Sequence, residues 1–124
     1  MSFMRKKQTL ANAFKNAFTG LCYFFSKERN GRIQAVIALF VVIVSVVLKI
    51  SAMEWIIIMI CIAAVLSLEM VNSSIEKLCD LVHTEYHPVI KTVKDVSAAA
   101  VLWVSIISAV VGTIIFLPKI TLLL

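Results

Sequence analysis

The sequence predicts an all-α integral membrane protein, with one amphipathic helix on the membrane surface followed by three transmembrane helices. Two observations indicate this class. Of the 124 residues, 61% are hydrophobic, and only three are Gly and two are Pro, so the apolar residues form a few long uninterrupted segments. A soluble chain of this length buries too small a fraction of its surface to hide so many apolar side chains, so lipid must cover the rest.

The first element, residues 9–27, is predicted to be the surface helix. Its large apolar residues recur every three or four positions and so share one helical face: Leu10, Phe14, Phe18, Leu21 and Phe25. Lys15 and Asn16 point in other directions. We therefore expect the apolar face to lie in the membrane and the polar side to face water and anionic headgroups. A soluble helix that docks on a partner protein is the alternative.

Three spans follow, and we predict them at residues 33–50, 53–82 and 96–117. At about 1.5 Å per residue, eighteen helical residues nearly cross a hydrocarbon core about 30 Å thick. The second span continues beyond its apolar part because neither Gly nor Pro interrupts it. Pro118 is expected to close the third span. A few residues join the first two spans, and the polar stretch 83–94 joins the last two, so residues 1–124 form a single domain.

The positions of the basic residues predict the orientation of these spans. Seven of the twelve Lys and Arg residues precede the first span: Arg5, Lys6, Lys7, Lys15, Lys27, Arg29 and Arg32. Lys77, Lys91 and Lys94 flank the second loop, and only Lys49 and Lys119 fall on the other side. Since basic residues favour the cytoplasm, we expect the N-terminus and the second loop to be cytoplasmic and the C-terminus to lie outside. This placement accounts for the net charge of +5 without nucleic acid.

The second span ends in a polar stripe. At about 100° per residue, Glu69, Asn72, Ser73, Glu76 and Asp80 fall on one face of a continuous helix. Ionisable groups at such depth are costly and commonly face a bundle interior or a watery cavity, where they are functional. Carboxylates this close repel one another, so either one of them keeps its proton or a cation joins them. The first state suits a general base and the second suits Mg²⁺.

The alternative for this stripe is a stabilising network with basic residues such as Lys94. The pair Lys94 and Asp95 at the start of the third span has two interpretations of its own. Lys can hold a phosphate as a point charge, whereas a topological Lys followed by a helix-capping Asp needs no ligand. His83 and His87 have the spacing of a metal-binding pair, but no third ligand is apparent, which favours an interface or a nucleotide-contacting loop.

Three motifs in order resemble the prokaryotic diacylglycerol kinase and undecaprenol kinase family. They are Glu28-x-Asn30-x-Arg32, then Glu69-x-x-Asn72-Ser73-x-Ile75-Glu76-x-x-x-Asp80, then Lys94-Asp95-x-x-x-Ala99-Ala100-Val101. The resemblance implies an ATP-dependent lipid kinase of the bacterial inner membrane. It also implies a homotrimer whose active sites are shared between subunits. The expected substrate is undecaprenol, with diacylglycerol as the alternative lipid.

The resemblance also implies roles for individual residues. Glu69 would take the proton from the lipid hydroxyl, with Asn72 beside it. Glu28 and Glu76 would hold Mg²⁺ that bridges the ATP phosphates. The remaining nucleotide contacts would come from Glu85, His87, Lys94 and Asp95. One departure from the family pattern is Gly31, where an aromatic residue is common, and we expect this glycine to loosen the junction between the surface helix and the first span.

Two other functional classes are compatible with the composition. Oligomeric helices with internal carboxylates also suit an ion channel. The acidic stripe occupies one end of the second span, however, and Glu54 is the only charge between Met53 and Leu68, which argues against a conduction path. A structural membrane subunit that recruits partners through its basic N-terminal helix is the other rival. Only the kinase would produce a phosphorylated lipid.

Overall fold

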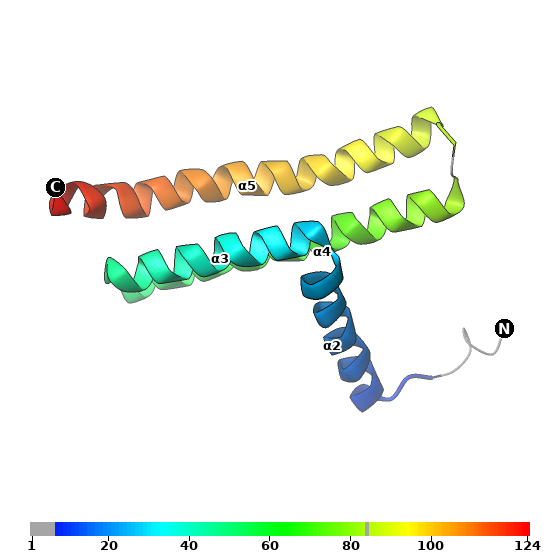
Figure 1. Cartoon of the computed structure of the whole chain (residues 1–124), viewed down its shortest axis with the longest axis horizontal. Coiled ribbons are helices and arrows are strands. Elements are labelled where there is room, and N and C mark those ends of the chain that lie inside the picture. The colour runs from blue at the N-terminus through cyan, green and yellow to red at the C-terminus, as the bar shows by residue number, and fades with distance from the viewer. Residues whose placement is uncertain (1–6, 84) are drawn as a thin grey trace.

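Four helices make up the part of the chain that the computed structural model describes, residues 7–83 and 85–124 (Figure 1). They are α2 (Leu10–Lys27), α3 (Arg29–Val47), α4 (Ala52–Val82) and α5 (Pro88–Leu123). The last three are each long and apolar enough to cross a membrane. The predicted all-helical class, with a helix preceding three candidate spans, is therefore confirmed. Arg5 and Lys6, which entered the predicted orientation, lie outside the described residues.

The three long helices run side by side, and α2 leaves them at a steep angle (Figure 1). The central helix is α4, which packs against both α5 and α3. Its 31 residues extend about 46 Å, well beyond a hydrocarbon core of about 30 Å. In Figure 1 the excess length of α4 projects past the junction between α2 and α3, together with the start of α5. This projecting end carries the polar residues that follow the apolar part of α4.

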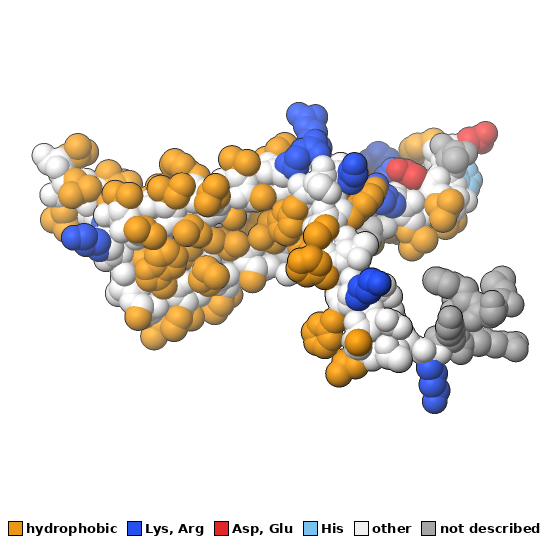
Figure 2. All heavy atoms as spheres, turned by 60° about the horizontal axis from the view of Figure 1, so that its bottom comes forward, with side chains coloured by type: hydrophobic (Ala, Val, Ile, Leu, Met, Phe, Trp, Pro, Cys, Tyr) orange, Lys and Arg blue, Asp and Glu red, His pale blue; other side chains and the backbone are white. Residues whose placement is uncertain are grey.

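Much of the outer surface of the three-helix bundle is apolar. Figure 2 shows hydrophobic side chains over the bundle face, with most of the basic side chains near the α2 end. On α2 itself, the apolar residues Leu10, Phe14 and Phe18 are exposed in the isolated chain. Lipid or other subunits must cover such surfaces, because water would solvate them poorly. This surface agrees with the predicted membrane setting of the bundle and of α2.

A single residue, Glu28, separates α2 from α3, so α3 begins at Arg29 rather than at the predicted residue 33. Glu28 has an extended backbone, which turns the chain sharply. Gly31 is buried at this bend, and a Cβ atom there would lie 2.2 Å from the carbonyl oxygen of Phe24. The prediction that Gly31 loosens the junction is therefore wrong. The missing side chain allows α2 and α3 to pack in close contact.

The other end of α3 is a Schellman turn, which ends the helix at Val47 rather than at the predicted residue 50. The Lys49 N–H donates to the carbonyl of Val46 at 3.2 Å, and the Ile50 N–H donates to the carbonyl of Ser45 at 3.3 Å. Lys49 has φ of 52°, the left-handed conformation that favours glycine. The chain reverses here and enters α4 after Ser51.

The apolar core of the chain lies near this turn. Ile50, Ile58 and Ile115 are buried and bring the α3–α4 turn, α4 and α5 together. Beside them, Lys119 Nζ forms an ion pair with Glu54 Oε1 at 3.0 Å. The α4–α5 pair is thus fixed at this end by apolar packing and one ion pair, while polar contacts join it at the projecting end.

Both predicted ends of the third span are wrong. Helix α5 begins at Pro88 rather than at residue 96, so the connection between α4 and α5 is shorter than the predicted 83–94 stretch. Proline suits the first helical position because no intrahelical partner awaits an N–H there, and the His87 ring accepts from the Val89 N–H at 3.2 Å. Helix α5 also continues through Pro118 to Leu123. Pro118 has no N–H and so removes one backbone hydrogen bond, but so near the end of the helix this loss does not stop the last turn from forming.

Candidate active site

The polar stripe of α4 meets two other elements, the α2–α3 junction and α5. Glu69, Asn72 and Ser73 are buried, with 4%, 5% and 7% of their surfaces exposed. They share one face because α4 runs through residues 69–76 without a Gly or Pro that could interrupt it. The structure therefore brings together the predicted base, its amide neighbour and a hydroxyl in a shielded place between helices.

Two hydrogen bonds hold Asn72 in one orientation. Ser97 Oγ on α5 donates to Asn72 Oδ1 at 2.7 Å, and Asn72 Nδ2 donates to Glu76 Oε1 at 3.2 Å. The amide therefore links α5 to the Glu76 carboxylate. Ser97 was not among the residues predicted for the site. The only signal was a hydroxyl near the start of the third span, at the depth of the stripe.

Glu69 lies at the centre of these contacts. The Asn30 side chain, from the first turn of α3, approaches its carboxylate, and Glu76 is close enough to repel it electrostatically. Asn30 belongs to the upstream motif, but no local pattern connects it with Glu69. A carboxylate that is buried yet contacted by an amide can accept a proton from a hydroxyl group brought beside it.

Glu28 contacts α4 through Lys77. The Lys77 Nζ atom lies 2.9 Å from Glu28 Oε1 and 5.6 Å from the centre of the Tyr23 ring. This contact is an ion pair without the angle of a hydrogen bond, so the buried Oε1 atom has no hydrogen-bond donor among the described residues. Glu28 is thus anchored beside the turn of α4 that also carries Glu76.

Lys94 and Asp95 do not contact Glu69 in this chain. Lys94 Nζ pairs with Asp80 Oδ1 at 2.7 Å, and Asp95 pairs with Lys91 at 2.5 Å. For Asp80, the structure therefore forms the ion pair with Lys94 that the alternative interpretation of the stripe described. The pair joins the projecting ends of α4 and α5, and Lys94 remains near enough to Glu76 to interact with its charge.

Glu85 and His87 lie farther from Glu69 than the other predicted site residues. Both are exposed in the loop between α4 and α5, which begins roughly 10 Å beyond Glu76 along the helix axis. The rings of His83 and His87 are 5.5 Å apart. Only the far end of a nucleotide whose phosphates lay at Glu76 could contact this loop.

The donor set fits Mg²⁺ bound together with phosphates. Residues 7–83 and 85–124 contain no group of three His, Cys, Asp or Glu side chains that could hold a metal unaided. Mg²⁺ does not require such a group, because it commonly binds through one or two carboxylates, substrate phosphates and water. Glu28 has an oxygen without a hydrogen-bond donor in the described chain, and Asn72 donates to only one oxygen of Glu76. These two carboxylates could supply the protein ligands.

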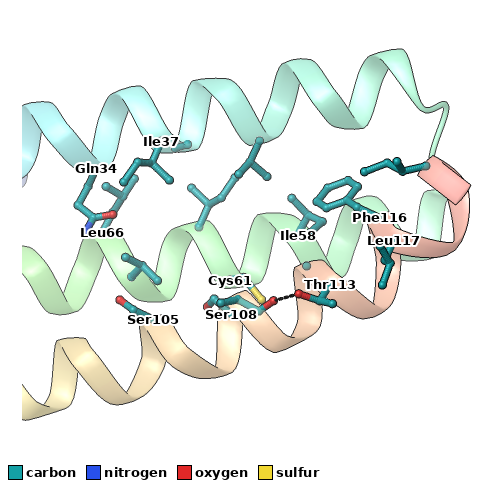
Figure 3. A pocket seen from close by; sticks show the side chains of 17 residues that line it. Gln34, Ile37, Ile58, Cys61, Leu66, Ser105, Ser108, Thr113, Phe116 and Leu117 are labelled. Carbon is teal, nitrogen blue, oxygen red and sulfur yellow. Dashed lines mark hydrogen bonds between the residues drawn. The ribbon is translucent and has the colours of Figure 1, made fainter.

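The buried residues of the α4 stripe and the polar side chains around them form what we call the polar site: Glu28, Asn30, Glu69, Asn72, Ser73, Glu76, Lys77, Lys94 and Ser97. An apolar groove begins next to it. It encloses about 560 Å³ between α3, α4 and α5. Figure 3 shows Gln34 and Leu66 at one end and Phe116 and Leu117 at the other. Leu66 precedes Glu69 by one helical turn, so the groove and the buried carboxylate are adjacent. Such a groove suits a hydrocarbon chain whose polar end is at Glu69.

Comparison with known proteins connects this arrangement to one family. The family described as prokaryotic diacylglycerol kinase matches residues 15–116. An undecaprenol kinase from Bacillus subtilis is 37% identical over 107 residues, covering 86% of this chain and 87% of the relative. A diacylglycerol kinase from Synechocystis is 32% identical over 107 residues. This match covers 86% of the chain but only 61% of the relative.

A third relative, a diacylglycerol kinase from Helicobacter pylori, is 34% identical over 98 residues, covering 73% of this chain and 76% of its own length. The family match extends from within α2 to within α5 and includes every residue of the polar site. The chain therefore belongs to the prokaryotic diacylglycerol kinase family and is a bacterial membrane lipid kinase.

Proposed function

We propose that this protein transfers the γ-phosphate of Mg²⁺-ATP to the hydroxyl of a membrane lipid alcohol, with undecaprenol as its preferred substrate. The observation that carries the proposal is the position of Glu69, which is buried beside Asn72 and Glu76 and adjacent to an apolar groove. A lipid tail in this groove would present its hydroxyl to the carboxylate. The N-terminus and the projecting ends of α4 and α5 would face the cytoplasm, where ATP is available.

Phosphoryl transfer demands mainly positioning and neutralisation of charge from the protein. Glu69 would accept the proton of the lipid hydroxyl as the hydroxyl oxygen attacks the γ-phosphorus of ATP. The bond from this phosphorus to the β–γ bridging oxygen would break, and ADP would leave. Ser97 and Asn72 would keep Glu76 in place. Bound Mg²⁺, held by Glu28 and Glu76, would neutralise charge on the phosphates.

The remaining predicted contacts would follow the nucleotide away from Glu69. Lys94 would leave Asp80 to contact the phosphates, and Asp95 would lie beside the nucleotide. The exposed loop with Glu85 and His87 would meet the end that carries the base. This order agrees with the axial order of these residues along α4 and α5.

The preference for undecaprenol rests on the relatives. The undecaprenol kinase relative is matched over 87% of its length, whereas the Synechocystis diacylglycerol kinase is matched over 61%. The apolar groove would accept part of the hydrocarbon chain of either lipid. Diacylglycerol, which also presents a primary hydroxyl, is the second candidate.

We also propose that the protein acts as a homotrimer with sites shared between subunits. In the isolated chain the Lys77 side chain is 57% exposed and that of Lys94 is 38% exposed, so the polar site is open on one side. The apolar residues of α5 are largely exposed as well, for example Leu102 and Trp103. Neighbouring copies would cover the apolar face of α5 and would border the polar site, which would stay open to ATP from the cytoplasm. Chemical cross-linking in detergent, resolved by mass, tests the number of subunits.

The function is tested with purified protein, radiolabelled ATP and each lipid alcohol in turn. Wild-type protein should label undecaprenol faster than diacylglycerol, and a channel or a structural subunit would label neither. Glu69→Gln should reduce kcat by about 100-fold or more, because a general base contributes about 10² to 10⁴, while ATP binding persists. Glu54→Gln, at the opposite end of α4, is the matched control. Near-normal turnover in Glu69→Gln would exclude Glu69 as the base.

A further inference from the structure

Lys77 is the one basic residue of the described polar site whose ion-pair partner is a proposed metal ligand. We infer that Lys77 is the resident counter-ion of Glu28 and that it gives up this carboxylate to Mg²⁺, then turns to the triphosphate. Lys77 would thus be a further residue of the nucleotide site, at a position that the second motif leaves unspecified. The inference rests on the proposed function, because it requires Glu28 to bind the metal of Mg²⁺-ATP.

The two partners of this ion pair differ in their freedom to move. Glu28 is the single residue between α2 and α3, and its side chain is only 20% exposed. Lys77 stands on the projecting part of α4 with 57% of its side chain exposed, and its ammonium also lies over the Tyr23 ring. A lysine head group on a flexible four-carbon stem can swing into water, whereas the carboxylate is fixed by the bend. When Mg²⁺ binds, the Lys77 ammonium would therefore move away and the Glu28 carboxylate would stay in place.

The contact between them is also one that a metal ion can replace. The Glu28 Oε1 atom is buried and receives no hydrogen bond of acceptable geometry within the described chain, although the ammonium is 2.9 Å away. Ion pairs this exposed contribute little stability. A buried carboxylate oxygen left with no cation would be unfavourable, however, so a second cation must take the place of the first. Mg²⁺, with its preference for carboxylate oxygen, meets this requirement.

The charges around the site indicate where Lys77 goes next. Lys91 and Lys94 on α5 pair with Asp95 and Asp80, which are not among the proposed metal ligands. Of these three lysines, only Lys77 would be displaced from its own ion-pair partner by Mg²⁺, because only its partner, Glu28, would bind the metal. It directly follows Glu76, so phosphates bridged between Glu28 and Glu76 would lie within reach of its ammonium. A point charge on a long stem is well suited to phosphate.

The test compares metal binding with nucleotide binding in the purified full-length protein. Mn²⁺ replaces Mg²⁺, and its weak binding to the two carboxylates, with water in the place of the phosphates, is measured by electron paramagnetic resonance at millimolar metal without nucleotide. Lys77→Met should bind Mn²⁺ roughly two- to fivefold more tightly than wild type, the range set by loss of an exposed competing ion pair. With Mn²⁺ saturating, the same variant should bind a non-hydrolysable ATP analogue several-fold more weakly. Lys77→Arg, which keeps the charge, should restore nucleotide binding.

The matched control is Lys119→Met, which removes a lysine from a similar ion pair, with Glu54 at 3.0 Å, at the opposite end of the bundle. It should change neither affinity. Unchanged or weaker Mn²⁺ binding in Lys77→Met would overturn the exchange, and unchanged analogue binding would overturn the move to the triphosphate. The variant Glu28→Gln distinguishes a failure of the Lys77 inference from a failure of the proposed metal site. If Glu28→Gln binds Mn²⁺ as wild type does, the metal assignment itself is wrong.

Discussion

Replacing Gly31 with alanine should disable the kinase, although Gly31 contributes no side chain to the polar site. The added Cβ atom would lie 2.2 Å from the Phe24 carbonyl oxygen and 2.9 Å from its carbon. Real Cβ atoms essentially never approach a heavy atom closer than 3.0 Å, so the backbone of α2 must retreat by about 0.8 Å. No flexible side chain can absorb this movement, because the atoms in the way belong to the backbone.

This shift of the α2 backbone would displace Glu28, which lies between Phe24 and Gly31 at the bend. Inserting a methyl group into a packed site costs about 1 to 3 kcal/mol, and a clash with backbone belongs at the upper end. A displacement of about 1 Å in a positioning group can reduce turnover about 100-fold. We therefore expect Gly31→Ala to lower the thermal unfolding midpoint and to reduce lipid phosphorylation by about two orders of magnitude.

The assay pairs thermal unfolding in detergent, followed by circular dichroism, with the radiolabelled ATP assay. Two other glycines provide matched controls. A Cβ atom added at Gly20, on α2, would meet no heavy atom within 4 Å, and one added at Gly112 would meet only the Phe116 ring, at 3.8 Å. Gly20→Ala should keep full activity and gain up to about 1 kcal/mol from helix propensity. If Gly31→Ala matched these controls in both measurements, the close contact between α2 and α3 would not exist as described.

Two further predictions concern residues whose importance depends on local geometry. Ser97→Ala should lower kcat by up to about tenfold, because it removes a hydrogen bond worth about 0.5 to 1.5 kcal/mol from Asn72. The control is Ser74→Ala, since the Ser74 hydroxyl donates to the Met70 carbonyl within α4, at 2.9 Å. Equal kcat in the two variants would contradict a positioning role for Ser97. Lys49→Gly should raise the unfolding midpoint by a few degrees. The substitution removes the strain of a left-handed lysine, about 1 to 2 kcal/mol, which exceeds the stability lost to the greater chain entropy of glycine, about 0.5 to 1 kcal/mol. A lower midpoint in circular dichroism would show that the Lys49 side chain stabilises the turn.

The helices and the face that carries the stripe could be predicted because they depend on local properties. Apolar periodicity, length and the absence of Gly and Pro determined α4 through Val82 and set Glu69, Asn72 and Glu76 on one side. The ends of α5 were harder to predict. Pro88 and Pro118 are breakers in most contexts, yet one lies at a first helical position and the other in a final turn, where each is tolerated.

Spacing within one segment was thus enough to predict an amphipathic N-terminal helix, three candidate spans and a carboxylate stripe at one end of the second span. Which groups meet that stripe depends instead on how the helices pack. Ser97 reaches Asn72 from α5, Lys77 reaches Glu28 at the bend, and Lys94 pairs with Asp80. These contacts join residues far apart in the chain, and they depend on how closely the helices approach. At Gly31 that approach depends on the absence of one carbon atom.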